Sequence, residues 1–138
     1  RVARGSGELC DWLDGKPDVA WLRVLVGNAP ERISEKAKMV AINGALAVDV
    51  AGQAVADTLG GAQFAGIGGH EDFIAASGME LEDRSLVCLP STALVGGELR
   101  SRITAQFGPG TVVTTPRHQL DVVVTEHGVP NCAAARAW

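Results

Sequence analysis

The chain turns at Gly66-Ile67-Gly68-Gly69-His70-Glu71-Asp72-Phe73, a glycine-rich stretch that leads into a helix expected over residues 71–77. Without Cβ atoms, such a turn lets backbone N–H groups approach a ligand closely. The same cluster can also form a plain strand-to-helix connection that binds nothing. It is not a dinucleotide fingerprint, because the third glycine and the acidic residue downstream are missing.

Around this turn, apolar runs alternate with helical spacing. Strands are expected at 19–26, 39–50, 54–59, 85–89, 103–107, 111–115 and 121–125, and helices at 7–14 and from Asn28-Ala-Pro30 to Lys38. Strands that alternate with short helices favour an α/β fold, with hairpins in the later half. The fold expected is therefore a mixed β-sheet flanked by short helices, in one compact domain over residues 1–138.

The bulk composition indicates a globular domain. Of 138 residues, 46% are hydrophobic, and the formal net charge is -4, which disfavours disorder and a nucleic-acid surface. No apolar run reaches the roughly 18 residues of a membrane span, and no secretory signal is recognisable. Three widely spaced cysteines, Cys10, Cys88 and Cys132, form neither a disulfide framework nor a metal motif, so a cytoplasmic location is expected.

Three further segments accompany the glycine turn in a fixed order: Met39–Gln53 with Ile-Asn-Gly-Ala-Leu-Ala-Val-Asp, Leu89-Pro-Ser-Thr-Ala93, and Val123-Val-Thr-Glu-His-Gly-Val129. Together they resemble the C-terminal domain of the acetyl-CoA hydrolase/transferase family, which includes 4-hydroxybutyrate and acetate CoA-transferases. The resemblance implies the α/β fold of the NagB/RpiA/CoA-transferase type. It also implies that the family's N-terminal domain and last helix are absent from residues 1–138.

The activity implied by the resemblance is transfer of CoA from an acyl-CoA to a small carboxylate, or acyl-CoA hydrolysis. Family enzymes form a glutamyl-CoA thioester, but their nucleophilic Glu lies upstream of the region that this chain matches. The chain is therefore expected to need an N-terminal CoA-transferase domain or subunit as partner. The competing hypothesis is a non-catalytic remnant that binds CoA or a partner surface. CoA is expected as a substrate, with no covalently bound cofactor and no membrane partner.

The resemblance also assigns roles at the site. The glycine matching Gly69 donates its N–H to the oxyanion that forms at the thioester carbonyl. Asn28 lies beside the carboxyl substrate, although Asn-x-Pro is equally a helix cap. Glu126 lines the CoA cleft, although it could be solvated surface. The weaker candidates for CoA or substrate binding are Gly66, Gly68, Asn43 and Arg102.

Other polar residues carry less weight. His70, Glu71 and Asp72 are consecutive, so they do not converge on one ion, and no metal site is expected. The lysines that follow Pro-Ser-Thr-Ala in the family are missing here, which leaves Arg100 or Arg102 to contact CoA phosphates. An apolar surface left open by the missing domain would favour homo-oligomers.

Overall fold

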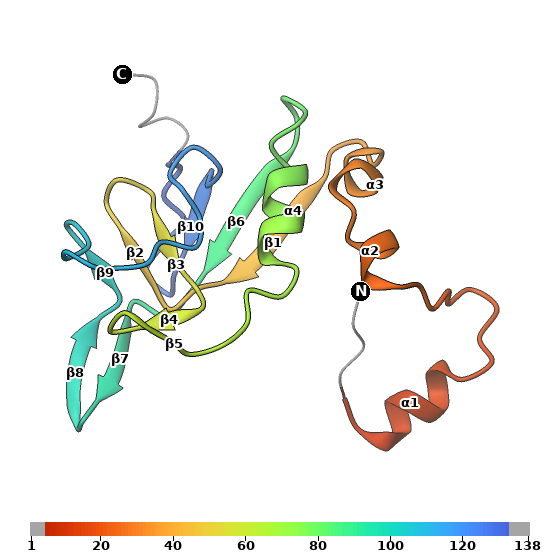
Figure 1. Cartoon of the computed structure of the whole chain (residues 1–138), viewed down its shortest axis with the longest axis horizontal. Helices are drawn as coiled ribbons and strands as arrows, with labels where there is room; N and C mark the ends of the chain where they lie inside the picture. Colours follow the sequence, from red (N-terminus) through yellow and green to blue (C-terminus); the bar gives the residue numbers. More distant parts are fainter. Residues whose placement is uncertain (1–4, 133–138) are drawn as a thin grey trace.

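The computed structural model describes residues 5–132, in which short helices flank small β-sheets (Figure 1). The helices are α1 (Gly7–Leu13), α2 (Val24–Gly27), α3 (Pro30–Ser34) and α4 (His70–Ala76). The strands are β1 (Val40–Gly44), β2 (Ala47–Asp49), β3 (Ala54–Val55), β4 (Thr58–Leu59), β5 (Ala62–Gln63), β6 (Arg84–Cys88), β7 (Thr92–Val95), β8 (Glu98–Ser101), β9 (Ile103–Thr104) and β10 (Val122–Val124). The expectation of an α/β fold is confirmed.

The largest parallel unit is the sheet β1-β6-β10. Asn43 of β1 pairs with Val87 of β6, and Val87 pairs with Val123 of β10. All three strands run the same way, so their carboxyl ends meet at one edge of the sheet. Helix α4 lies over this sheet and contributes Ile74, which is fully buried, to the core. The rest of the hydrophobic cluster is formed by Val48, Ala54, Val87, Leu89, Leu120 and Val123.

The mixed pairing lies in a second sheet, β3-β2-β9, where β2 is antiparallel to β3 and parallel to β9. Two antiparallel hairpins, β4-β5 and β7-β8, complete the strands of the described region. The hairpin character expected in the later half is therefore confirmed, although the sheets are several and small. Short strands of two to five residues form because glycine turns interrupt the apolar runs.

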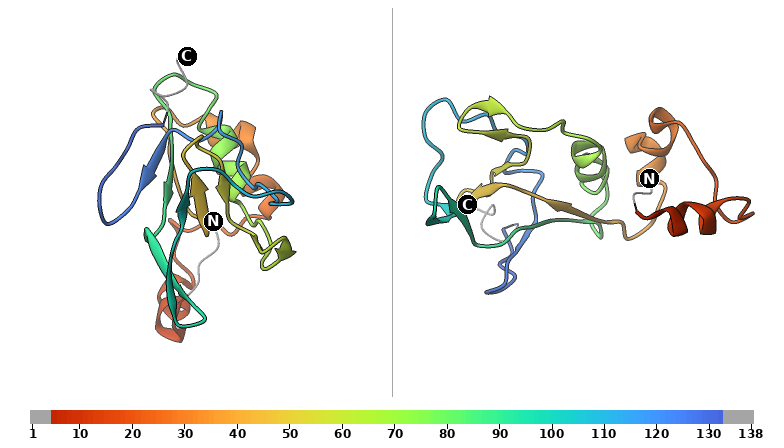
Figure 2. Two further views of the ribbon diagram at one scale, coloured as in Figure 1. Left: turned by 90° about the vertical axis from the view of Figure 1, so that its left-hand side faces the viewer. Right: turned by 90° about the horizontal axis from the view of Figure 1, so that it is seen from below.

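The strand expected at residues 19–26 is wrong. The segment includes the short helix α2 and pairs with no strand of the described region, and Trp21 and Leu25 are 66% and 88% exposed. The apolar run was misleading because nothing in residues 5–132 covers it. In Figure 2, α1 and this segment lie beside the sheets and not on them, while α3 packs against α4.

Other boundaries were also too long. The helix that begins at Pro30 ends at Ser34, before Lys38, which has a left-handed φ of 57°. Residues 111–115 form no strand and contribute only one isolated bridge, between Ala54 and Thr115. The expectation that the family's last helix is absent falls in part on residues 133–138, which lie outside the described residues. Within residues 5–132, no helix is long and apolar enough to cross a bilayer.

Candidate functional site

A hollow of about 630 Å³ brings three of the predicted site residues together. Asn28 precedes α3, Asn43 belongs to β1, and Gly69 ends the glycine turn at the N-terminus of α4. Apolar side chains make up most of the remaining wall, which is formed by Met39, Val40, Ala41, Ile42, Ile67, His70 and Phe73. No Lys or Arg is among these lining residues.

Gly69 is required here by close packing and not by its backbone angles. Its φ of -93° suits any residue, but a Cβ at this position would lie 2.5 Å from Nδ2 of Asn28. The turn itself depends on Gly68, whose φ of 62° favours glycine. Within residues 5–132, the Gly69 N–H makes no hydrogen bond, and Gly69 borders the hollow.

Asn28 is held in place by the helix that follows the turn. Its Nδ2 donates to Oδ2 of Asp72 at 3.3 Å. The alternative interpretation of Asn28 as the N-cap of α3 is wrong, because Ala29 occupies that position and the Asn28 side chain makes no capping bond. Asn28 instead ends α2, where its backbone N–H donates to the carbonyl of Val24 at 2.8 Å.

Asn43 contributes an incompletely bonded amide to the wall of the hollow. The residue is half-buried, and its Nδ2 is buried with no hydrogen-bond partner among the described residues. A buried amide nitrogen without an acceptor is costly in free energy, so such groups are uncommon. The Asn43 amide is therefore a lining group of this hollow with an unused hydrogen-bond donor.

Glu126 follows β10 at the same edge of the parallel sheet but lines a different hollow, of about 430 Å³. Its carboxylate accepts from Ser91 three times: the backbone N–H reaches Oε2 at 2.8 Å and Oε1 at 3.2 Å, and the hydroxyl reaches Oε1 at 2.5 Å. The Ser91 hydroxyl, and after it the Ser91 backbone N–H, lower the pKa of Glu126 to about 2. Glu126 is therefore a carboxylate at neutral pH.

The remaining candidates, Gly66, Gly68 and Arg102, do not line the larger hollow. Gly66 is exposed and, like Gly68, belongs to the turn, while Ile67 between them lines the larger hollow. Arg102 lines neither hollow; its backbone links the ends of two strands, donating to Ser91 and accepting from Val48. The structure thus joins Asn28, Asn43 and Gly69, places Glu126 at the same sheet edge, and leaves Arg102 apart.

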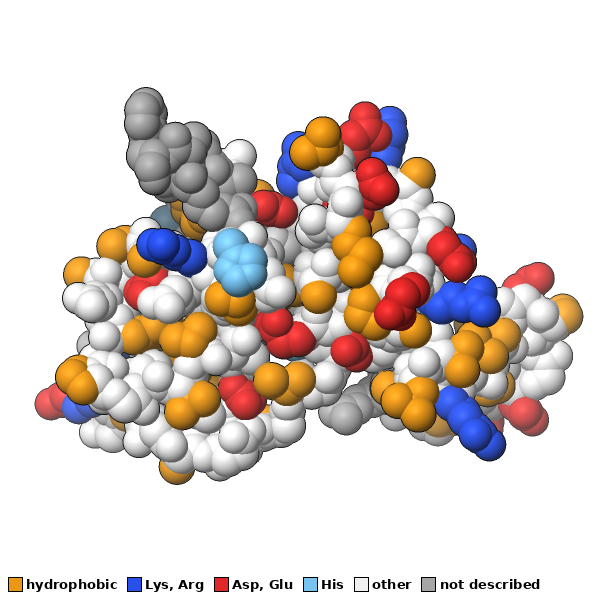
Figure 3. All heavy atoms as spheres, turned by 45° about the horizontal axis from the view of Figure 1, so that its top comes forward, with side chains coloured by type: hydrophobic (Ala, Val, Ile, Leu, Met, Phe, Trp, Pro, Cys, Tyr) orange, Lys and Arg blue, Asp and Glu red, His pale blue; other side chains and the backbone are white. Residues whose placement is uncertain are grey.

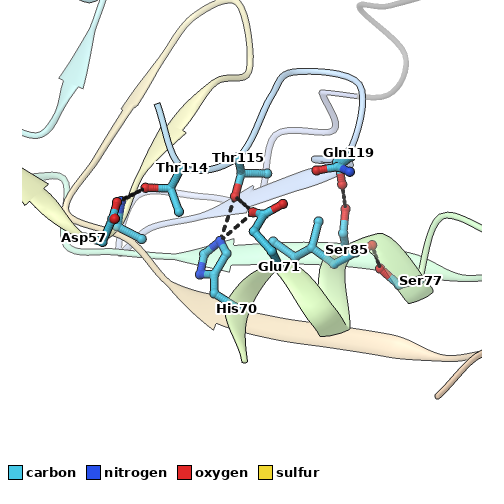
Figure 4. Close-up of polar contacts among 10 residues, drawn as sticks. Asp57, His70, Glu71, Ser77, Ser85, Thr114, Thr115 and Gln119 are labelled. Carbon is cyan, nitrogen blue, oxygen red and sulfur yellow. Dashed lines mark hydrogen bonds and ion pairs between the residues drawn. The ribbon is translucent and has the colours of Figure 1, made fainter. Parts of the chain in front are cut away.

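A buried polar network anchors the start of α4 (Figure 4). The Thr115 hydroxyl donates to Oε1 of Glu71 at 2.6 Å, and Nε2 of His70 lies 2.8 Å from the same hydroxyl oxygen. Since the single hydroxyl proton faces Glu71, Nε2 of His70 carries a proton and donates it. Burial lowers the pKa of His70. Beside it, the Thr114 hydroxyl donates to Asp57 at 2.5 Å.

Sequence reasoning missed the partners of the predicted residues. It assigned no role to Ser91, Thr115 or the carboxylate of Asp72 as a hydrogen-bonding partner of Asn28. Ser91 belongs to the Pro-Ser-Thr-Ala motif, and Glu126 belongs to the Thr-Glu-x-Gly motif. The presence of both motifs in this chain was the one signal that could have suggested a contact between Ser91 and Glu126. Among the described residues, no group of three or more His, Cys, Asp or Glu side chains converges as metal ligands would.

Comparison with known proteins identifies the family of the chain. The model of the acetyl-CoA hydrolase/transferase C-terminal domain matches residues 5–138, and the chain belongs to this family. The chain is 37% identical over 125 residues to 4-hydroxybutyrate coenzyme A transferase of Clostridium kluyveri, covering 91% of the chain and 29% of the relative. It is 34% identical over 137 residues to butyryl-CoA:acetate CoA-transferase of Anaerostipes caccae, covering 99% and 31%.

Solved structures show the same relationship. The crystal structure of RipA from Yersinia pestis superposes with a TM-score of 0.79 at 31% identity, covering 92% of this chain and 28% of that chain. The chain therefore spans about 30% of the length of the relatives it matches. CoA transfer is supported at the level of the family, and CoA thioesters are the substrates of such enzymes.

Proposed function

We propose that residues 1–138 form the C-terminal part of a CoA-transferase site, which moves CoA from an acyl-CoA to a small carboxylate. The observation that carries this proposal is the unbonded N–H of Gly69 in a hollow too tight at that point for any side chain. Hydrolysis of an acyl-CoA uses the same groups with water as acceptor. Family membership supports the reaction class.

In this proposal, the thioester carbonyl lies against Gly69. When a nucleophile attacks the carbonyl carbon, negative charge develops on its oxygen, and the Gly69 N–H donates to that oxygen. A fixed donor of this kind lowers a barrier by about 3 kcal/mol. Asn28 lies next to Gly69 and presents its amide to the carboxyl substrate, while Asp72 fixes the orientation of that amide.

The attacking carboxylate is supplied from outside these residues. We propose that an N-terminal CoA-transferase domain or subunit brings the glutamate that forms the glutamyl-CoA thioester. Glu126 then has a supporting role: its bonds to Ser91 keep it ionised and fixed at the edge of the cleft. A pKa near 2 makes it a poor proton acceptor at neutral pH, so we do not assign it as the general base.

The larger hollow suits the acyl and thioester end of the substrate better than its phosphates. The hollow is mostly apolar, and its lining contains no Lys or Arg. On the face drawn in Figure 3, the Lys and Arg side chains lie apart from one another and form no continuous field. The candidates for contact with the phosphates of CoA are Arg100 and Arg102. Gly66 and Gly68 shape the glycine turn beside this hollow. We also propose that the protein lies in the cytoplasm.

Calorimetric titration of the purified chain with CoA and acetyl-CoA tests the proposal. We expect saturable micromolar binding that Gly69→Ala weakens and that Gly108→Ala, at an open position outside both hollows, leaves unchanged. No binding at millimolar ligand would mean that residues 1–138 hold no CoA cleft by themselves, and of the alternative it would leave only a non-catalytic remnant that binds a partner surface. Adding the N-terminal domain of the Clostridium kluyveri relative should then separate the two: transfer activity supports a divided site, and its absence supports the remnant.

A further inference from the structure

The hairpin β7-β8 has an open edge with little support from the rest of the described chain. All four residues of β8 are exposed, and the cross-strand pair Leu94 and Leu99 is 75% and 70% exposed. In Figure 1 the hairpin extends away from the other sheets, and the views of Figure 2 agree. Isolated two-stranded hairpins are only marginally stable in water, and exposed edges favour pairing with another chain.

The turn of the hairpin determines which backbone groups are free. Gly96 and Gly97 have φ values of 60° and 86°, which are typical of a two-residue type I′ turn. In such a turn, the N–H of Glu98 points back to β7. The same alternation appears further along, where the Arg102 N–H donates to the Ser91 carbonyl at 2.8 Å. In an antiparallel pair, alternate residues of a strand direct their N–H and C=O toward the partner strand. Residues 98 and 102 face β7, so the N–H and C=O of Leu99 point away from it.

The charges around this free position are self-complementary. Glu98 and Arg100 flank Leu99 and project from the opposite face of the strand, where Nη2 of Arg100 lies 3.2 Å from Oε2 of Glu98. If two copies of β8 pair antiparallel about a two-fold axis at Leu99, residue 98 of each copy lies opposite residue 100 of the other. Each Glu98 then faces an Arg100, and the two Leu99 side chains face each other.

We propose that β8 is a homodimerisation strand, which pairs antiparallel with β8 of a second copy in this register. The pairing satisfies the outward N–H and C=O of Leu99 and turns two hairpins into a four-stranded antiparallel sheet. It places two opposite-charge pairs across the new edge, each of a kind that stabilises sheets. The edge of β7 offers no equivalent, because Leu94 is flanked by Ala93 and Val95, which carry no charge.

Analytical ultracentrifugation of the purified chain over a concentration series tests the proposal. We expect a reversible dimer of modest affinity, because a paired hairpin is a small interface. Glu98→Arg and Arg100→Glu each replace two opposite-charge pairs by two like-charge pairs, and should raise the dissociation constant by about tenfold or more. Glu80→Arg, at an exposed position elsewhere, is the matched control and should change nothing.

Charge exchange distinguishes this register from any other. The double variant E98R/R100E should dimerise like the original chain. An equimolar mixture of the two single variants should associate more tightly than either variant alone, because a strand with arginine at both positions then pairs with a strand that has glutamate at both. A monomer at all concentrations, or single variants that dimerise normally, would overturn the proposal.

A proline substitution tests the backbone pairing. Leu99→Pro removes an N–H that faces away from β7, so the hairpin should persist while dimerisation is lost. Leu94→Pro removes the corresponding outward N–H on the other edge and should leave the dimer intact. Circular dichroism checks that both variants keep the fold. Equal loss in both variants, or in neither, would contradict pairing through β8.

Discussion

Substitution of Gly69 by alanine gives the sharpest test of the packing around the proposed site. A Cβ at this position would lie 2.5 Å from Nδ2 of Asn28, a distance that real Cβ contacts do not show. Because the φ of Gly69 is -93°, alanine brings no backbone strain. The Asn28 amide must therefore move, and its 3.3 Å hydrogen bond to Asp72 is lost.

The expected cost follows from that single bond. A hydrogen bond to a charged carboxylate contributes about 1.5–3 kcal/mol, and both partners here are partly exposed, so we expect a loss near the lower limit. A destabilisation of about 1.5 kcal/mol should lower Tm by roughly 3–6 °C in a domain of this size. Asn28→Ala removes the same bond and should cost a similar amount, while it makes room for the new Cβ.

A double-mutant cycle by urea unfolding measures this coupling. In the Asn28→Ala background, Gly69→Ala should cost almost nothing, so the two effects should be non-additive by about 1 kcal/mol or more. Gly66→Ala is the matched control, because a Cβ there meets no atom within 4 Å and its φ is not positive. If Gly69→Ala is as stable as Gly66→Ala, or if the two effects simply add, the close approach of Asn28 is not what requires glycine.

Two further predictions concern the polar contacts. Glu126 should titrate with a pKa of about 2 by NMR, so its contribution to stability is full above about pH 4.5 and is lost as the pH falls through 2. Ser91→Ala should raise the pKa of Glu126, and a pKa near 4.5 in the original chain would refute the Ser91 contacts. Thr115→Val removes the hydroxyl to which both His70 and Glu71 are hydrogen-bonded and should destabilise by about 1–3 kcal/mol in urea unfolding, whereas Thr111→Val at a half-buried position should cost less.

Local patterns predicted much of the fold because they depend on neighbouring residues. The glycine turn, the helix after it and the strand at residues 85–89 follow from residue types within a few positions. The strand expected at residues 19–26 failed for the opposite reason. An apolar run specifies burial, and whether a run becomes a strand depends on a partner strand, which residues 5–132 do not provide there.

For the site, the sequence alone determined the motifs and their order, and with them the family and the residues Asn28, Gly69 and Glu126 as candidates. Only the tertiary structure decided which of these share a hollow, that Asp72 holds Asn28, and that Ser91 keeps Glu126 ionised. Residue types and spacing along the chain reflect local chemistry, whereas these contacts join residues 35 to 44 positions apart. The contact of Ser91 with Glu126 depends on how the parallel strands β6 and β10 align their ends, and the contact of Asn28 with Asp72 depends on how the end of α2 meets α4. Both are properties of the folded chain.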